Sequence, residues 1–255
     1  MRWRTIETFR HGDRTMLVHR PPHESDTGPH FVLVHGIGVS ALYHARLARA
    51  LAPSGSVHVV DLPGFGQAPR PGRPLGIEDH AGVLNAYVRT AGLPHPHLVG
   101  HSMGTQVVVE AALQEPDLYA GVVAIGGVVD PEARSAARQA LRLAHDVLRE
   151  PPTTNWTVLS GYARTGLRWY LRTLPVMLDY RTEEALPRLR VPLLVVRGDR
   201  DPIATGPWAA HMGRLAGTRV VEIEGAAHVA MHTHPDQVAS AVLEHARAVA
   251  GQCPA

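Results

Sequence analysis

The sequence contains no lysine, and all 25 basic residues among its 255 are arginines. Without lysine the chain cannot form a Schiff base with a carbonyl substrate or with pyridoxal phosphate, and it lacks the lysine of a phosphate-binding P-loop. The arginines are scattered along the chain and nearly balanced by 23 acidic residues, so the formal net charge is only +2. This distribution gives no support for nucleic-acid binding.

Cysteine and long apolar runs are equally scarce. Cys253 is the single cysteine, so the chain has no internal disulfide, which fits a reducing compartment. No run approaches the ~20 apolar residues that a membrane-spanning helix needs. The first residues, Met1 to Glu7, lack the apolar core of a signal peptide. We therefore expect no membrane span and a cytoplasmic location.

The stretch with the clearest chemical meaning is Gly100 to Gly104, which reads G-H-S-M-G. It follows an apolar segment, 96–99, and precedes 105–113, which has no glycine or proline. This context predicts a strand-to-helix turn that holds Ser102 in a strained conformation, with flanking glycines where a Cβ atom would collide. In a chain with 24 glycines the G-x-S-x-G pattern alone can arise by chance, so the flanking strand and helix carry the prediction.

Short apolar runs alternate with helical patterns along most of the chain. Runs of this length, rich in β-branched residues, are typical of strands buried on both faces. Their alternation with helices predicts an α/β fold with a mostly parallel central sheet and helices on both faces. A hairpin over residues 3–18 is expected at one edge. The expected strands are 30–34, 56–60, 96–99, 121–125, 192–196 and 219–223, and the expected helices are 41–51, 77–91, 105–113, 206–215 and 235–249.

The alternation stops between residues 131 and 187, where the pattern is helical and no buried strand is indicated. The helices expected there include 131–150 and a short one near 182–186. We interpret 1–130 and 188–255 as the core and 131–187 as a helical cap insertion over the active edge of the sheet. A helical decoration at the periphery is the alternative.

Three residue types with complementary chemistry follow predicted strands. Serine is a weak nucleophile that needs a base, usually an imidazole oriented by a carboxylate. Ser102, Asp201 and His228 each follow a strand, and the carboxyl ends of parallel strands meet at one edge of a sheet. The order Ser, Asp, His is that of an α/β-hydrolase triad. Asp199 is the alternative carboxylate.

These motifs, in this order, resemble the α/β-hydrolase superfamily, in its branch with a helical cap, over essentially the whole chain. The resemblance implies that Ser102 is the nucleophile, His228 the general base and acid, and Asp201 the orienting carboxylate. It also implies an oxyanion hole made by the backbone N–H groups of Met103 and of Ile37, the latter within the sequence His-Gly-Ile-Gly.

Other positions extend or depart from this pattern. The loop from Asp61 to Gly66 resembles the D-x-P-G-x-G loop of the superfamily, to which we assign a structural role near the site. Thr105 stands where many relatives have glycine, and Val39 stands where a small or polar residue is frequent. These departures bear on the substrate more than on catalysis.

We expect a serine hydrolase that cleaves a small-to-medium carboxylic ester, thioester or lactone through an acyl-enzyme. The alternatives are carbon–carbon bond hydrolysis, cofactor-free haloperoxidase or perhydrolase activity, lyase chemistry, or a non-catalytic ligand-binding module. A serine at position 102 argues against haloalkane dehalogenase and epoxide hydrolase activity, which need a carboxylate there. Apolar residues expected to bind the substrate, each of which could instead belong to the core, are Val39, Val128, Trp156, Trp169 and Val229. Tyr170 is a further candidate from the cap.

A metal site near the C-terminus is the remaining alternative for the histidines. His228 and His232 have a spacing seen in metal ligands, and His234 is close by. No neighbouring carboxylate or cysteine completes such a set, and Pro235 favours an extended His234. We therefore expect no metal, no cofactor and a small-molecule substrate as the partner. The sequence does not indicate an oligomeric state.

Overall fold

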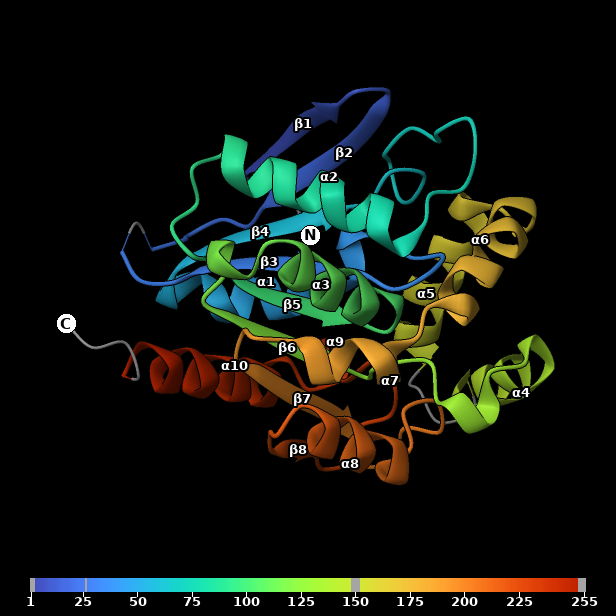
Figure 1. Ribbon diagram of the computed structural model, residues 1–255. Coiled ribbons are helices and arrows are strands. Elements are labelled where there is room, and N and C mark those ends of the chain that lie inside the picture. Colours follow the sequence, from blue (N-terminus) through green and yellow to red (C-terminus); the bar gives the residue numbers. More distant parts are fainter. Residues whose placement is uncertain (1–2, 26, 148–151, 252–255) are drawn as a thin grey trace.

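An eight-stranded sheet forms the centre of the protein (Figure 1). The computed structural model describes residues 3–25, 27–147 and 152–251, so Cys253 lies outside the described residues. The strand order is β1-β2-β4-β3-β5-β6-β7-β8. Strand β2 runs antiparallel to both of its neighbours, β1 and β4, and the six strands from β3 to β8 are parallel to one another. The strands are β1 (Thr5–His11), β2 (Arg14–Arg20), β3 (His30–Val34), β4 (Ser56–Asp61), β5 (His97–His101), β6 (Gly121–Ile125), β7 (Leu193–Gly198) and β8 (Val220–Ile223).

Helices cover both faces of the sheet because each parallel strand is apolar on both sides. On β3, Val32 and Val34 lie in one core cluster, with side chains of α2, α3 and α8. Phe31 and Leu33, which alternate with them, lie in the other cluster, with α1, α9 and α10. The sandwich confirms the predicted α/β architecture. These helices are α1 (Ala45–Leu51), α2 (Ile77–Thr90), α3 (Met103–Gln114), α8 (Gly206–Leu215), α9 (Ala230–Thr233) and α10 (Pro235–Ala250).

The described residues between β6 and β7 form helices joined by short turns, and they add no strand to the sheet. Its first helix begins later than the sequence pattern indicates, because Pro131–Ala133 forms a separate 3-10 turn in which Asp130 accepts a hydrogen bond from the Glu132 N–H. Figure 1 shows α4, α5 and α6 beyond one end of the sheet. The helices are α4 (Ala136–Val147), α5 (Pro152–Thr165), α6 (Leu167–Asp179) and α7 (Thr182–Ala185).

Hydrogen bonds attach this helical segment to the core. The Thr165 hydroxyl donates to the Gly38 carbonyl at 2.9 Å, and the Gln106 amide donates to the Met177 carbonyl at 3.0 Å. The glycine carbonyl belongs to the loop after β3, so the helices are fixed directly to the carboxyl edge of the sheet. That this segment works as a cap over a catalytic site, with the bounds 131–187, stays a prediction.

The order of the strands creates a natural crevice at that edge. Strands β4 and β5 lie on opposite sides of β3, so the chain reverses its winding direction between β3 and β5. Ligands of open α/β sheets bind outside the carboxyl ends at such a switch point. No helix within the described residues is both long and apolar enough to cross a lipid bilayer.

Candidate active site

Ser102 lies between β5 and α3 in a backbone conformation that non-glycine residues rarely adopt, with φ 54° and ψ −122°. Three hydrogen bonds hold this turn. The Ser102 N–H donates to the Ile125 carbonyl at 3.0 Å, while its carbonyl accepts from the Thr105 N–H at 2.9 Å and from the Thr105 hydroxyl at 2.6 Å. Thr105, the departure from the family pattern, therefore supports the turn with an additional hydrogen bond.

The glycines on either side of the turn are required by close backbone contacts. A Cβ atom on Gly100 would lie 2.3 Å from the Gly104 carbonyl oxygen, and a Cβ on Gly104 would lie 2.3 Å from the Val34 oxygen. A Cβ on Gly36 would lie 2.9 Å from the Ser102 Cβ. The G-x-S-x-G pattern is thus explained by the approach of β3, β5 and α3 to one another.

His228 and Asp201 form a buried pair at the ends of β8 and β7. The His228 Nδ1 lies 2.8 Å from the Asp201 Oδ2, while the Asp201 Oδ1 accepts from the N–H groups of Ile203 at 2.7 Å and Ala204 at 2.9 Å. Burial alone would raise the Asp201 pKa, but the His228 charge and these hydrogen bonds outweigh it and lower the pKa. Asp199 is exposed, so the structure pairs Asp201 with the histidine.

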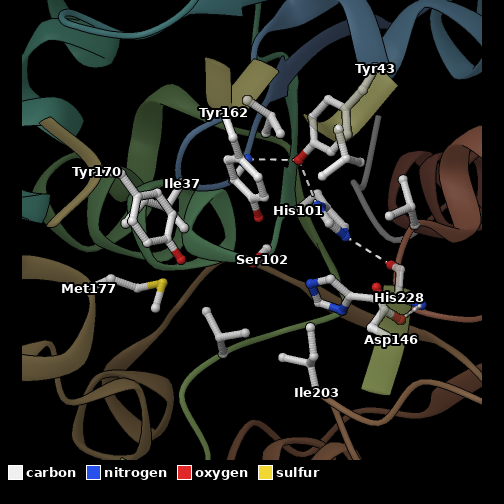
Figure 2. Close-up of a pocket in the computed structure, with 15 residues that line it drawn as sticks. Ile37, Tyr43, His101, Ser102, Asp146, Tyr162, Tyr170, Met177, Ile203 and His228 are labelled. Atoms are coloured by element: carbon white, nitrogen blue, oxygen red, sulfur yellow. Dashed lines mark hydrogen bonds between the residues drawn. The ribbon is translucent and has the colours of Figure 1, made fainter. Parts of the chain in front are cut away.

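The geometry determines which His228 nitrogen carries the proton. An ionised carboxylate only accepts hydrogen bonds, so the Nδ1 donates to Asp201. When the ring is neutral, its Nε2 is an acceptor. Figure 2 shows the His228 ring directed toward Ser102 across the pocket that both residues line. Such an arrangement can remove a proton from a serine hydroxyl.

The loop after β3 holds the Ile37 N–H in a fixed direction. The His35 Nε2 accepts from the Leu62 N–H at 3.0 Å, so the Nδ1 of this neutral, buried ring donates to the Gly36 carbonyl at 2.7 Å. Burial is the main cause that lowers the His35 pKa. Because that carbonyl shares a planar peptide with the Ile37 N–H, fixing one aims the other the opposite way.

The two amides proposed for oxyanion binding differ in their surroundings. Ile37 lines the pocket. Met103 is fully buried and is the first residue of α3, where the N–H groups of a helix have no acceptor within that helix. Neither N–H has a hydrogen-bond acceptor among the described residues.

The loop after β4 is held by Asp61, whose carboxylate accepts from the N–H groups of Ala41 at 2.6 Å and Gln67 at 3.0 Å and lies 3.1 Å from the His19 Nε2. A Cβ on Gly66 would lie 2.3 Å from this carboxyl group. Asp61 therefore joins β2 and two loops, which is the structural role assigned to this motif from the sequence.

Ser102 and His228 open into a cavity of about 60 Å³ between the sheet edge and the helical segment. Its core side carries Ile37, Val39, Val128 and Val229, and its opposite side carries side chains of α4, α5 and α6. Room for a few water molecules suits a small acyl group. The other lining residues are Gly36, Tyr43, His101, Asp146, Val158, Tyr162, Tyr170, Met177 and Ile203.

The prediction that Trp156 and Trp169 line the pocket needs correction. Trp156 is 76% exposed on the outside of α5. Trp169 is buried, but its ring packs against Gly64, and the guanidinium groups of Arg70 and Arg172 each lie 5.7 Å from the ring centroid. An aromatic residue in a helix has a sequence signal for burial but none for the direction in which it is buried.

Tyr170 was indicated by the sequence as a cap candidate and lines the pocket, whereas Tyr162 and Asp146 were not predicted. Tyr162 and Tyr170 contact each other with ring centroids 5.3 Å apart, and a Cβ on Gly38 would lie 2.4 Å from the Tyr162 ring. Asp146 on α4 is buried and accepts from the His228 N–H at 3.1 Å. No motif marks these positions, since the packing of the helical segment on the sheet brings them to the site.

The histidines near the C-terminus do not form a metal site in the described part of the chain. No group of three or more His, Cys, Asp or Glu side chains there is arranged to hold a metal ion. The His232 Nδ1 faces the Tyr43 carbonyl at 3.3 Å instead, and His234 contacts Thr233.

Known proteins share this architecture and resemble this sequence over most of its length. The sequence profile of the alpha/beta hydrolase family matches residues 31–241. An (E)-2-((N-methylformamido)methylene)succinate hydrolase of Acinetobacter baylyi is 26% identical over 244 residues, covering 86% of this chain and 90% of that protein. A pimeloyl-(acyl-carrier protein) methyl ester esterase of Xanthomonas campestris is 29% identical over 245 residues, covering 84% of this chain and 94% of that protein.

A solved structure of a thermophilic esterase from Thermogutta terrifontis superposes with a TM-score of 0.79, at 20% identity, over 96% of this chain and 99% of the other. At that identity the likeness shows the fold alone. The family profile spans most of the chain, so the protein belongs to the alpha/beta hydrolase family, and a hydrolase activity fits its relatives.

Proposed function

We propose that this protein is a serine hydrolase that cleaves an uncharged, small-to-medium carboxylic ester, thioester or lactone through an acyl-enzyme on Ser102. The proposal is carried by one observation: Asp201 holds the His228 Nδ1 at 2.8 Å while the ring faces Ser102. In this mechanism His228 removes the hydroxyl proton as Ser102 attacks the carbonyl, and then returns it to the leaving group. Water activated by the same histidine releases the acyl group.

The negative charge that develops on the carbonyl oxygen needs donors in fixed positions. The Ile37 and Met103 amides are suited to this role because one is aimed by the His35 hydrogen bond and the other lies at the start of a helix. Removing one such donor costs on the order of 10²–10³ in rate in enzymes of this kind.

The lining argues for an uncharged acyl group. The relative from Acinetobacter baylyi is named for a succinate derivative, and succinates carry two carboxylates. The described residues that line this cavity include the carboxylate of Asp146 but no arginine, and most are apolar. An anionic acyl group would lose its hydration there without gaining an arginine partner among these described residues.

Stopped-flow release of p-nitrophenol from acyl esters of increasing chain length tests the proposal. We expect a burst with the native protein and no burst with Ser102→Ala, because only the serine oxygen can hold the acyl group. A fluorophosphonate should label the peptide that contains Ser102. The acyl chain length that gives the fastest release then indicates the size of the acyl group that the pocket accepts.

Ser240→Ala is the matched control, since Ser240 is exposed on α10; it should keep the full burst. Turnover by folded Ser102→Ala at the native rate would overturn the proposed nucleophile. No release at any chain length from the native protein would instead favour carbon–carbon hydrolysis or lyase chemistry with the same triad.

A further inference from the structure

The hydroxyl of Tyr43 lies where three parts of the site meet (Figure 2). Tyr43 belongs to the 3-10 helix Ala41–His44 and is 3% exposed. Its oxygen accepts from the Gly36 N–H at 2.7 Å and lies 2.6 Å from the His101 Nδ1. The His101 Nε2 in turn lies 2.9 Å from the His228 carbonyl oxygen. One chain of hydrogen bonds thus joins the loop after β3, this 3-10 helix, the end of β5 and the loop after β8.

The direction of every proton in this chain follows from its two ends. The His228 carbonyl can only accept, so the His101 Nε2 carries the proton. Burial lowers the His101 pKa well below its ordinary value, so the ring is neutral and its Nδ1 is an acceptor. Tyr43 must therefore donate its hydroxyl proton to His101 while accepting from Gly36, which leaves no donor or acceptor of this chain unused.

We propose that Tyr43 and His101 are positioning residues that hold the oxyanion loop, the nucleophile turn and the loop of the general base at fixed separations. The inference rests on the proposed function. Gly36 precedes Ile37, which supplies one amide to the oxyanion, and His101 directly precedes Ser102. The third contact is to the backbone of His228 itself.

The three segments are close enough for a small shift in one to move the others. A Cβ on Gly36 would lie 2.9 Å from the Ser102 Cβ and 3.3 Å from the Tyr43 oxygen. The rings of His101 and His228 have centroids 4.6 Å apart. Misplacement by about 1 Å can cost on the order of 10² in rate, so loss of the central hydroxyl should be measurable in turnover.

Tyr43→Phe tests the proposal because it removes the hydroxyl and keeps the ring. We expect kcat for acyl ester hydrolysis to fall about 10- to 100-fold while KM changes by less than about threefold. The burst amplitude should remain while its rate falls, because Ser102 is still present.

Tyr87→Phe is a matched control for the loss of a buried tyrosine–histidine hydrogen bond. The Tyr87 hydroxyl lies 2.5 Å from the His58 Nδ1, and neither residue lines the pocket. Its thermal midpoint should fall like that of Tyr43→Phe, but kcat should stay within about twofold of native. Equal losses of kcat in the two variants would overturn the proposal, as would an unchanged kcat in Tyr43→Phe.

Substitution of His101 gives a second test. His101→Gln keeps one acceptor and one donor on a planar group and should recover most of the native kcat, whereas His101→Ala should resemble Tyr43→Phe. If His101→Ala folds and turns over at the native rate, His101 has no positioning role. Failure of the proposed function is seen separately, as a burst that persists in Ser102→Ala.

Discussion

Two buried histidine–aspartate pairs lie at the carboxyl edge of the sheet in the described part of the chain. His228 pairs with Asp201 at 2.8 Å and His19 pairs with Asp61 at 3.1 Å. Each carboxylate also accepts two backbone N–H groups, and each has a lowered pKa although burial opposes ionisation. The two pairs are of similar length and burial, although Asp201 contacts the Nδ1 of His228 and Asp61 contacts the Nε2 of His19.

The two imidazole rings also differ in the surroundings of the part of the ring that does not contact the aspartate. The His228 ring faces Ser102 and a cavity. The His19 ring lies against Trp3, with centroids 5.3 Å apart, and its second nitrogen is buried without a hydrogen-bond partner in the described residues. A histidine–aspartate pair is therefore not a catalytic signature by itself, since access to a nucleophile and a pocket distinguishes the two.

The largest difference between the two pairs is expected in kcat, when Asp201→Asn is compared with Asp61→Asn. An asparagine at 201 presents its N–H to the His228 Nδ1 and favours the wrong tautomer, so we expect kcat to fall about 10³–10⁴-fold. Asp61→Asn should leave kcat of the folded protein nearly unchanged and lower the free energy of unfolding by about 1–3 kcal/mol.

Steady-state kinetics and urea denaturation of both variants measure these effects. The comparison fails if Asp61→Asn loses as much kcat as Asp201→Asn. It also fails if Asp201→Asn keeps its native kcat.

The stability of the fold should fall in mild acid, independently of the His228–Asp201 pair. His44, His58 and His80 are buried, and burial lowers the pKa of each to about 3 from an ordinary value of 6.5. The unfolded chain binds these protons and the folded chain does not. This stability is therefore fully present above pH 6.5 and is lost as the pH falls toward 3.

With three such groups, the free energy of unfolding should fall by up to about 4 kcal/mol per pH unit between these limits. Urea denaturation at several pH values measures the slope. A flat profile between pH 6.5 and 4 would contradict the lowered pKa values. Activity measured at the same pH values then separates protonation of the active site from unfolding.

A smaller difference in kcat/KM is expected between Ala substitutions at two glycines with positive φ. Gly38 lies beside the pocket, and Gly12 lies in the turn between β1 and β2. Gly38 has φ +78°, and a Cβ there would lie 2.4 Å from the Tyr162 ring, whereas Gly12 has φ +61° and open space around it. Gly12→Ala should cost about 1–2 kcal/mol of stability without changing kcat/KM.

Gly38→Ala carries a similar backbone cost and also displaces the loop or the tyrosine, so kcat/KM should fall about tenfold. Thermal denaturation and ester hydrolysis of both variants provide the measurement. Equal kcat/KM values for the two would show that Tyr162 adapts to the added methyl group without disturbing the site.

Much of the fold could be read from local patterns. The apolar runs 30–34 and 121–125 are strands within the bounds expected, because a strand buried on both faces is apolar at every position. The strand-to-helix turn at Ser102 could also be predicted, since the steric need for glycine at positions 100 and 104 arises within one strand–helix junction. Helix α4 was placed less well because Pro131 and Asp130 stabilise a separate turn before it.

The sequence by itself determined the α/β sandwich, the family, and Ser102, Asp201 and His228 as candidates, because strand periodicity and strand-end motifs are short-range features. Only the tertiary structure decided that Asp201 rather than Asp199 contacts His228, that Trp169 packs away from the pocket, and that the Tyr43 hydroxyl links Gly36 to His101. Those outcomes depend on how segments distant in the chain are packed together. No spacing along the chain encodes the direction in which a buried side chain will point.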